Sequence, residues 1–334
     1  LVSGVCLAEM GHNVICVDND LQKVKQINSS IPPIYEKKLE NLLKNNLNKR
    51  FYATTDIQKA IMDTEVSIIA VGTPFEKNKI NLKYIKEALK HIGLSLKLKE
   101  TYHTVVVKST VVPGTTDGVA KSILEKFSGK KVGDGFGLGM NPEFLRESMA
   151  VDDFMNPDRL IFGASDQRTH EVLEKIYFSF NKENVLKTSS KTAEMIKYTS
   201  NCFLATLISF SNEIGNLCSS LGGVDSEDVM KGVVLDKRIS PILSDGQRVF
   251  PEIISYLQAG CGFGGSCFPK DVKALIAHGQ SFNEPMKLLT SVIDINNNQP
   301  EKILEKVHKY FPKLKGVKIA VLGLAFKPGT DDIR

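Results

Sequence analysis

Features that mark several classes of protein are missing from this sequence. It contains no run of about 18 apolar residues, so we predict no membrane-spanning helix. The net charge is +5, yet the lysines and arginines form neither a basic stripe nor an arginine-rich arm, and no nucleic-acid partner is expected. A mildly basic chain of this kind is instead compatible with an anionic substrate.

Cysteine and histidine are sparse and irregularly placed. The six cysteines include no Cys-x-x-Cys pair, and the six histidines join no cluster with metal-ligand spacing. A chain of this size without a disulfide framework is typical of a reducing compartment. We therefore expect free thiols, a cytoplasmic location and no bound metal.

Strand-type and helix-type segments alternate over the first half of the chain. Short apolar runs at Asn13–Val17, Val66–Val71 and Thr104–Val107 predict buried strands, and Leu82–Leu98 and similar stretches between them predict helices. This alternation predicts an α/β fold with a Rossmann-like, doubly wound parallel sheet. Any ligand is then expected at the carboxyl ends of the strands.

The pattern changes near residue 189. Thr192–Leu221 predicts a long helix with no strand inside it, whereas Glu301–Phe311 and Lys318–Leu322 predict a helix and a strand that open another α/β domain. With 334 residues, more than one core is expected. The expected parts are a dinucleotide-binding domain at 1–188, a helical central domain at 189–299, and the start of a second Rossmann-like domain at 300–334.

Features of the first domain favour NAD as its ligand. Asp18 closes a strand, where its carboxylate can accept both ribose hydroxyls and repel a 2′-phosphate, although a turn aspartate is equally common there. Small residues follow two further strands at Gly72–Pro74 and Ser109–Thr110. The glycine turn that normally cradles the pyrophosphate is absent, as is most of the last domain, so we expect the sequence to be truncated at both ends.

The segment Gly260–Leu275 is the most specific in the chain. Its glycines predict a loop with exposed backbone, and Pro269 suits a first helical turn, which places Cys267 at a helix N-terminus. The dipole and unpaired N–H groups at such an end favour a thiolate and can hold an oxyanion. Asp271 follows one turn later and is suited to handling water. The alternative is an inert structural cysteine.

Two polar pairs have helical i, i+4 spacing. Lys197 and Asn201 predict a cation and an amide on one helix face, suited to stabilising an alkoxide, with a solvated polar face as the alternative. Glu143 and Glu147 share a face if their segment is helical, and one of them could assist hydrolysis. A surface carboxylate pair is the alternative for these two residues.

Several separated motifs resemble the UDP-glucose/GDP-mannose dehydrogenase family, and the resemblance covers essentially the whole chain. The motifs are Gly11-His12-Asn13-Val14 with Asp18, Val71–Pro74, Lys108–Thr115, Asn141–Glu147, Ala193–Tyr198, Gly260–Leu275 and Gly323–Lys327. The resemblance implies a four-electron oxidation of a sugar C6 alcohol with two NAD, in which a cysteine forms a thiohemiacetal and then a thioester.

The resemblance also implies roles for particular residues. It places the nucleophile at Cys267, the lysine at Lys197 and the water-handling aspartate at Asp271. The other catalytic positions it implies are Asn201, Glu143 and Thr110. The cofactor contacts it implies are Asp18, Lys23, Thr73, Thr110, Lys270 and Arg334. The substrate contacts it implies are Glu143, Glu147, Lys197, Asn201, Tyr256, Gly264, Lys327 and Arg238, the last lent by a neighbouring subunit of a homodimer or larger homo-oligomer.

The substrate and the function class each have alternatives. The residues around Cys267 resemble the UDP-glucose branch, which is the preferred interpretation, whereas Lys108–Thr115 and Ala193–Tyr198 are also close to GDP-mannose dehydrogenases. UDP-N-acetylmannosamine is a third candidate, and polysaccharide biosynthesis is the expected context. A non-catalytic NAD-binding scaffold is the competing class, but Cys267, Lys197 and Asp271 are all present, which favours an enzyme.

Overall fold

The computed structural model describes residues 1–333 and divides the chain into two compact units. The first unit comprises Leu1–Glu76, Ile80–Lys197 and Lys327–Asp331, and the second is built mainly from Tyr198–Phe326. Helix α9 (Ser190–Leu221) contributes its residues up to Lys197 to the first unit and the remainder to the second.

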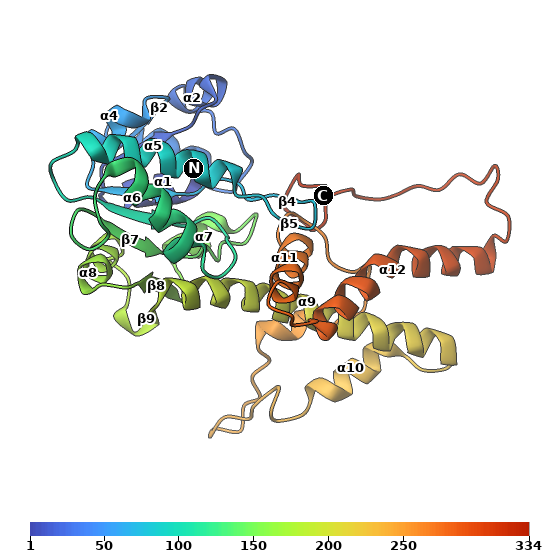
Figure 1. Ribbon diagram of the computed structural model, residues 1–334. Coiled ribbons are helices and arrows are strands. Elements are labelled where there is room, and N and C mark those ends of the chain that lie inside the picture. The colour runs from blue at the N-terminus through green and yellow to red at the C-terminus, as the bar shows by residue number, and fades with distance from the viewer. Residues whose placement is uncertain (334) are drawn as a thin grey trace. The chain divides into compact units, whose positions relative to one another are not determined.

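The first unit is built on a five-stranded sheet (Figure 1). In spatial order its strands are β3 (Val66–Ile69), β6 (Thr104–Val107), β7 (Gly137–Met140), β8 (Leu160–Ala164) and β9 (Val185–Thr188). Strands β1 (Val14–Val17) and β2 (Phe51–Thr54) form a separate parallel pair, and β4 (Phe75–Glu76) pairs with β5 (Lys79–Ile80). The Rossmann-like architecture is confirmed. The expectation of a wholly parallel sheet is wrong, because β8 runs antiparallel to β7.

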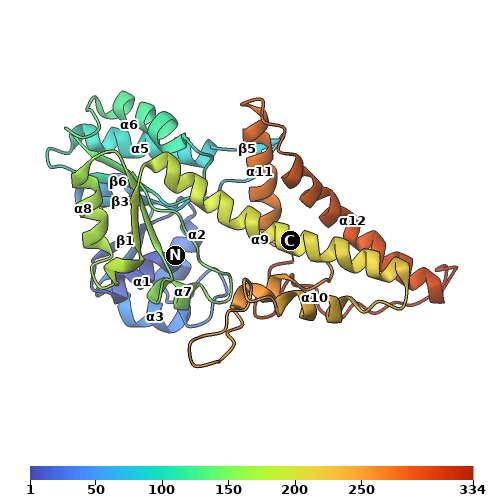
Figure 2. The same ribbon diagram turned by 90° about the horizontal axis from the view of Figure 1, so that it is seen from below.

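Helices cover both faces of this sheet (Figure 2). Along β6 the side chain of Val106 packs into one core, and those of Val105 and Val107 pack into the other, because successive strand residues point to opposite faces. The helices on the Val106 side are α1 (Val2–Glu9), α2 (Leu21–Asn28), α3 (Leu39–Asn46), α7 (Ala150–Met155) and α8 (Gln167–Ile176). On the other side lie α4 (Ile57–Met62), α5 (Lys83–Leu98) and α6 (Lys121–Ser128).

The start of α9 is tied to the loop after β6 through a buried carboxylate. Glu194 accepts hydrogen bonds from the backbone N–H of Gly114 at 2.5 Å, and from the backbone N–H and hydroxyl of Thr116 at 2.8 and 2.7 Å. Burial nevertheless raises the pKa of Glu194 to about 7, against the effect of these three donors. The loop leads into a π-helical turn, Thr115–Ala120, which extends α6 at its N-terminus.

The second unit is helical. After α9 come α10 (Ser226–Val234), the short 3-10 helix Glu252–Tyr256, α11 (Phe268–Gln280) and α12 (Lys287–Tyr310). The long helix predicted from Thr192 is confirmed, and it begins at Ser190. Among residues 1–333, no helix is long and apolar enough to cross a membrane.

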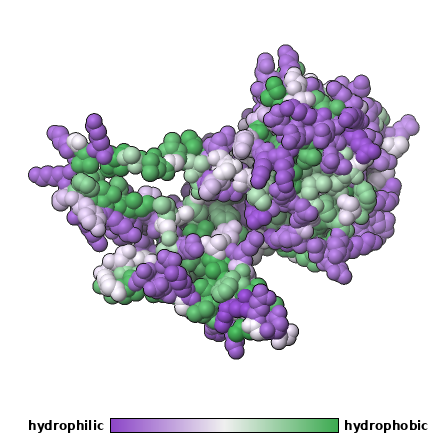
Figure 3. Space-filling model, turned by 180° about the vertical axis from the view of Figure 1, so that it is seen from behind, coloured by the Kyte–Doolittle hydropathy of each residue, from purple (hydrophilic) through white to green (hydrophobic). Residues whose placement is uncertain are grey.

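Two expectations for the end of the chain are wrong. A helix was expected to begin after Pro300, but α12 runs through this proline without a break, which costs the helix one backbone hydrogen bond. The run Lys318–Leu322 forms no strand, because the described residues offer it no partner strand, and Leu322 is 95% exposed. Figure 3 shows apolar residues on the surface of the second unit.

Candidate functional site

Cys267 occupies the N-cap of α11, and Pro269 lies in the first turn of that helix. The thiol is exposed, so a small molecule can reach it. The preceding loop needs two of its glycines, since Gly262 and Gly265 have φ angles of 90° and 77° that other residues rarely adopt. The helix end expected from the sequence is therefore present, and the nucleophilic role of Cys267 stays a prediction.

The other cysteines differ from Cys267 in their surroundings. Burial raises the pKa of Cys6 and of Cys202 to about 12, so both remain thiols at neutral pH. All six cysteines are free, and of these Cys261 and Cys267 are exposed. The chain thus presents two accessible thiols, and one of them stands at a helix N-terminus.

Asp271 lies one turn after Cys267 and is buried with both carboxylate oxygens paired. Its backbone N–H donates to the Cys267 carbonyl at 2.8 Å. Lys270 Nζ contacts Oδ1 at 2.5 Å, and Asn201 Nδ2 donates to Oδ2 at 2.6 Å. A buried charge needs such partners to offset its desolvation. From the sequence, Asp271 was expected to handle water, Lys270 to contact NAD and Asn201 to contact the substrate. The structure brings these three residues together.

Lys197 precedes Asn201 by one turn of α9 and is also buried. Its side chain is packed in the first unit, where Nζ lies 5.3 Å from the ring centroid of Phe144. The guanidinium of Arg159 lies 4.2 Å from the same ring. Lys197 is 6% exposed and Asn201 is 7% exposed, so the alternative of a solvated polar face is wrong.

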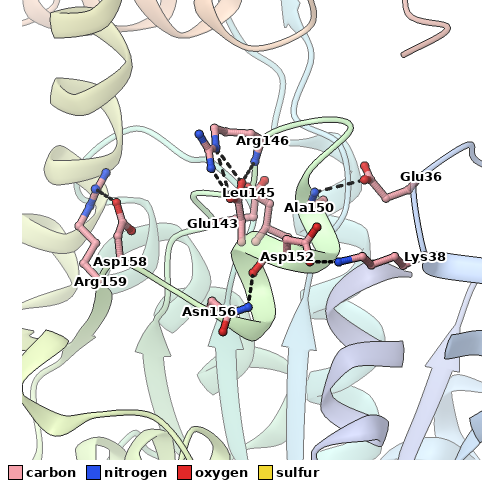
Figure 4. Close-up of polar contacts among 11 residues, drawn as sticks. Glu36, Lys38, Glu143, Leu145, Arg146, Ala150, Asp152, Asn156, Asp158 and Arg159 are labelled. Atoms are coloured by element: carbon pink, nitrogen blue, oxygen red, sulfur yellow. Dashed lines mark hydrogen bonds and ion pairs between the residues drawn. The ribbon is translucent and has the colours of Figure 1, made fainter. Parts of the chain in front are cut away.

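The segment Asn141–Glu147 has no helical structure (Figure 4). The helical spacing of Glu143 and Glu147 therefore does not place them on one face, and their carboxylates have different partners. The Glu143 carboxylate accepts from the backbone N–H of Leu145, and that of Glu147 accepts from the hydroxyl of Thr330. Arg146 forms a bidentate ion pair with Asp153. This ion pair fixes the end of the segment.

Tertiary contacts hold this segment at its first residue. Asn141 donates to the Ile161 carbonyl at 3.0 Å and accepts from Tyr177 at 2.6 Å and from Lys108 Nζ at 3.1 Å. Burial lowers the pKa of Lys108 to about 8, and the nearby Glu143 charge acts in the opposite direction. Lys108 was not singled out from the sequence, although a lysine directly after an apolar strand is a recognisable signal.

Of the residues expected to contact NAD, three follow strands of the first unit, whereas Lys23 lies on α2 and Lys270 lies on α11 in the second unit. Thr73 follows β3 and donates its hydroxyl to the Thr110 carbonyl, which follows β6, at 2.7 Å. Asp18 follows β1 and accepts from the backbone N–H of Asp20 at 2.9 Å. Lys23 is exposed, 3.9 Å from the Asp20 carboxylate. The open space beside Gly72 fits a ligand that approaches the backbone here.

The remaining predicted residues have varied surroundings. Arg238 is exposed and forms an ion pair with Asp236 at 2.5 Å. Tyr256 ends the 3-10 helix and Gly264 lies in the cysteine loop, both in the second unit, and Lys327 belongs to the first. Arg334 lies outside the described residues. Among residues 1–333 there is no group of three or more potential metal ligands.

Models of two domains of one protein family match the chain. The NAD binding domain of the UDP-glucose/GDP-mannose dehydrogenase family matches residues 1–181, and the central domain of that family matches residues 191–298. The two matches together cover most of the sequence.

Individual relatives agree with these matches. UDP-glucose 6-dehydrogenase of Haloferax volcanii is 43% identical over 98% of this chain and 74% of its own length. GDP-mannose 6-dehydrogenase of Pseudomonas aeruginosa is 40% identical over 98% of this chain and 72% of its own. The solved UDP-glucose dehydrogenase of Pyrobaculum islandicum has a TM-score of 0.91 at 38% identity, over 100% of this chain and 73% of that one.

Proposed function

The chain belongs to the UDP-glucose/GDP-mannose dehydrogenase family, and from this premise we propose that it oxidises UDP-glucose at C6 through a covalent intermediate on Cys267. It is an NAD-dependent nucleotide-sugar 6-dehydrogenase. The observation that carries the covalent proposal is the exposed Cys267 thiol at the N-terminus of α11, one turn before the buried Asp271 carboxylate. The sugar and the residue roles below are our proposal.

NAD, when bound, accepts a hydride from C6 in each of two oxidations. In the first oxidation the alcohol also loses its hydroxyl proton and becomes an aldehyde. The Cys267 thiolate then adds to the aldehyde carbon, and the oxygen takes up a proton to give a thiohemiacetal. Loss of a second hydride and of that proton leaves a thioester. Water cleaves the C–S bond, which releases the carboxylate and restores the thiol. The balance is one acid and two NADH for each sugar.

Each proposed residue has chemistry suited to a step. The N–H groups at the start of α11 can stabilise an oxyanion on C6, and Lys197 supplies a cation that offsets alkoxide charge. Asp271 handles the proton of the hydrolytic water, and Asn201 holds its carboxylate in place. Asp18 and Thr73 are suited to contact NAD. These assignments rest on chemistry and on the matching family positions.

The network around Asp271 also argues against a non-catalytic scaffold. Burying a carboxylate is costly, and a paired buried charge is often no more stabilising than an apolar group of similar size. An exposed thiol one helical turn before that carboxylate adds nothing to stability. Both features are useful in a chain that forms and hydrolyses a thioester.

The proposed substrate is tested by following NADH formation in the full-length protein with UDP-glucose, GDP-mannose and UDP-N-acetylmannosamine. We expect the highest kcat/KM with UDP-glucose and two NADH for each uronate formed, as the reaction balance requires. A higher kcat/KM with either other sugar would reassign the substrate. Absence of oxidation with all three, in protein that binds NAD, would contradict the proposed function.

We further propose a homodimer formed along α9. Apolar residues recur at alternating intervals of four and three along this helix, a pattern typical of a helix–helix seam. Its most exposed members, Phe203, Phe210, Leu217 and Leu221, are between 47% and 66% exposed. A second copy that covers this stripe would also be the neighbouring subunit whose substrate Arg238 is expected to contact. The free cysteines support a cytoplasmic location, and polysaccharide precursor synthesis is the proposed context.

Phe210→Glu tests the dimer. A charge in the middle of the stripe should be left without a partner in the seam, so we expect monomers at concentrations where the unaltered protein is dimeric. Ser219→Glu places the same charge on the exposed surface of α9 outside the stripe and should leave the dimer intact. Molar mass is measured by light scattering after size exclusion. An unaltered protein that is monomeric, or equal dissociation in both variants, would contradict the proposal.

A further inference from the structure

Side-chain amides hold the backbone of the loop that leads to Cys267. The N–H of Gly260 donates to Asn212 Oδ1 at 2.7 Å, and the carbonyl of Gly260 accepts from Gln299 Nε2 at 2.7 Å. Gln299 also donates to Asn212 Oδ1 at 3.3 Å, which connects the two amides. Both polar groups of the Gly260 backbone are thus held by side chains, one from α9 and one from α12.

A second pairing lies three residues further along the loop. The N–H of Phe263 donates to Asn296 Oδ1 at 2.7 Å, and Asn296 Nδ2 donates back to the Phe263 carbonyl at 3.0 Å. This exchange of two hydrogen bonds is what a neighbouring β-strand would provide. Asn296 lies on α12, one turn before Pro300. Its side chain makes the two hydrogen bonds to the loop backbone that the backbone of a paired strand would otherwise make.

The glycine between these pairings fits the arrangement. Gly262 has a φ of +90°, and a Cβ added there would lie 2.5 Å from Asn296 Oδ1. Any larger residue would therefore push Asn296 away from Phe263. The ring of Phe263 in turn packs edge-on against Phe268, with centroids 6.1 Å apart. Phe268 is the first residue of α11 and directly follows Cys267.

These contacts form a continuous path from α9 and α12 to the nucleophile. We propose that Asn212, Asn296 and Gln299 are positioning residues that form an amide clamp on the loop Gly260–Phe263 and so fix Cys267 at the start of α11. The inference rests on the proposed role of Cys267. The segment from Gly260 to Cys267 contains four glycines and therefore has large conformational freedom, and the clamp restrains its first half before the substrate binds.

The clamp acts on the rate of the covalent step. The thiolate sulfur and the N–H groups that receive the oxyanion must keep a fixed relation to C6, and small errors in such a relation are costly. Asp18 and Thr73, which are assigned to NAD, lie in the first unit, whereas every clamp contact lies within the second. Lys270, the NAD contact proposed on α11, makes none of the clamp hydrogen bonds. Loss of the clamp is therefore expected to lower kcat and leave the KM for NAD unchanged.

The test uses three variants of the full-length protein and a matched control. Asn296→Ala removes both bonds to Phe263, Asn296→Asp keeps the acceptor for the Phe263 N–H, and Gly262→Ala displaces Asn296 with no clamp side chain altered. Asn297→Ala is the control, because this asparagine is the next residue of α12 and is exposed. The readouts are kcat, the KM for NAD, and the rate at which iodoacetamide alkylates Cys267, measured by peptide mass spectrometry.

Asn296→Ala and Gly262→Ala are expected to lower kcat roughly tenfold to a hundredfold, with slower alkylation of Cys267. Asn296→Asp should also lower kcat, because its second oxygen faces the Phe263 carbonyl with no proton to donate, and Asn297→Ala should match the unaltered protein. Equal kcat in Asn296→Ala and Asn297→Ala would overturn the clamp, as would a rise in the KM for NAD equal to the fall in kcat. If Asn296→Ala does not fold, Asn296→Asp and Gly262→Ala decide by the same measurements.

The clamp and the proposed function can fail separately. If Cys267→Ser still formed the acid, Cys267 would not be the nucleophile, and both the proposed function and the clamp would lose their basis. If Cys267→Ser is inactive and the Asn296 and Gly262 variants behave like Asn297→Ala, the covalent mechanism stands and only the clamp is wrong.

Discussion

Cys267→Ser in the full-length protein is expected to reduce uronate formation by at least about a thousandfold while NAD binding is unchanged. The serine hydroxyl keeps nearly the same shape at the N-cap of α11, but it is a far poorer nucleophile than a thiolate at neutral pH. The thioester then does not form, and the second oxidation has no covalent intermediate. NAD binding is measured by calorimetry, and the acid is quantified by chromatography.

Cys261→Ser is the matched control for this prediction. Cys261 is the other exposed cysteine, in the same glycine loop six residues earlier, but it does not cap a helix. Its replacement should leave acid formation close to that of the unaltered protein. Undiminished acid formation by Cys267→Ser, or equal losses in the two variants, would show that the helix N-terminus is not the nucleophilic site.

Much of the fold was predictable from local patterns. Buried strands such as Thr104–Val107 are continuous apolar runs, and helices such as α5 show apolar periodicity, so both types stand out in the sequence. The helix start at Cys267 was predictable because Pro269 favours a first helical turn. The direction of β8 was not predictable, because the alternation of strands and helices that predicts a parallel sheet does not reveal a single strand that runs the other way.

The parts that could not be predicted depend on distant contacts. Asn141–Glu147 has helical spacing of its glutamates, but the buried bonds of Asn141 to Tyr177 and Lys108 hold the segment in a non-helical conformation. Lys318–Leu322 has the composition of a strand, and a strand forms only where a partner is available.

The same limit applies to the site. Asn296 is one of three consecutive asparagines in a polar part of α12. No feature of the neighbouring sequence distinguishes its role from those of Asn297 and Asn298. Only its contacts with Phe263 identify it as part of the loop support. The pairing of Asp271 with Asn201 was equally hidden, because the two residues are 70 positions apart in the sequence.

Asp271→Asn is expected to slow the release of acid roughly a hundredfold to a thousandfold and to leave the thioester on Cys267. The amide cannot take a proton from water. It also places an NH₂ group against either Lys270 or Asn201, both of which donate to the present carboxylate. Hydride transfer and thioester formation do not need Asp271 in this scheme, so hydrolysis becomes the slow step.

The expected signature is a burst of two NADH for each active site, followed by slow turnover. Acid-quenched protein should carry the sugar acyl group on the peptide that contains Cys267, detectable by its mass. Asp228→Asn, the same change at an exposed carboxylate on α10, is the control and should show neither effect. If Asp271→Asn slowed the first NADH as strongly as the steady state, with no acyl group on Cys267, Asp271 would have to act before hydrolysis. Its place one helical turn after the nucleophile would then serve the oxidation steps and not the release of the product.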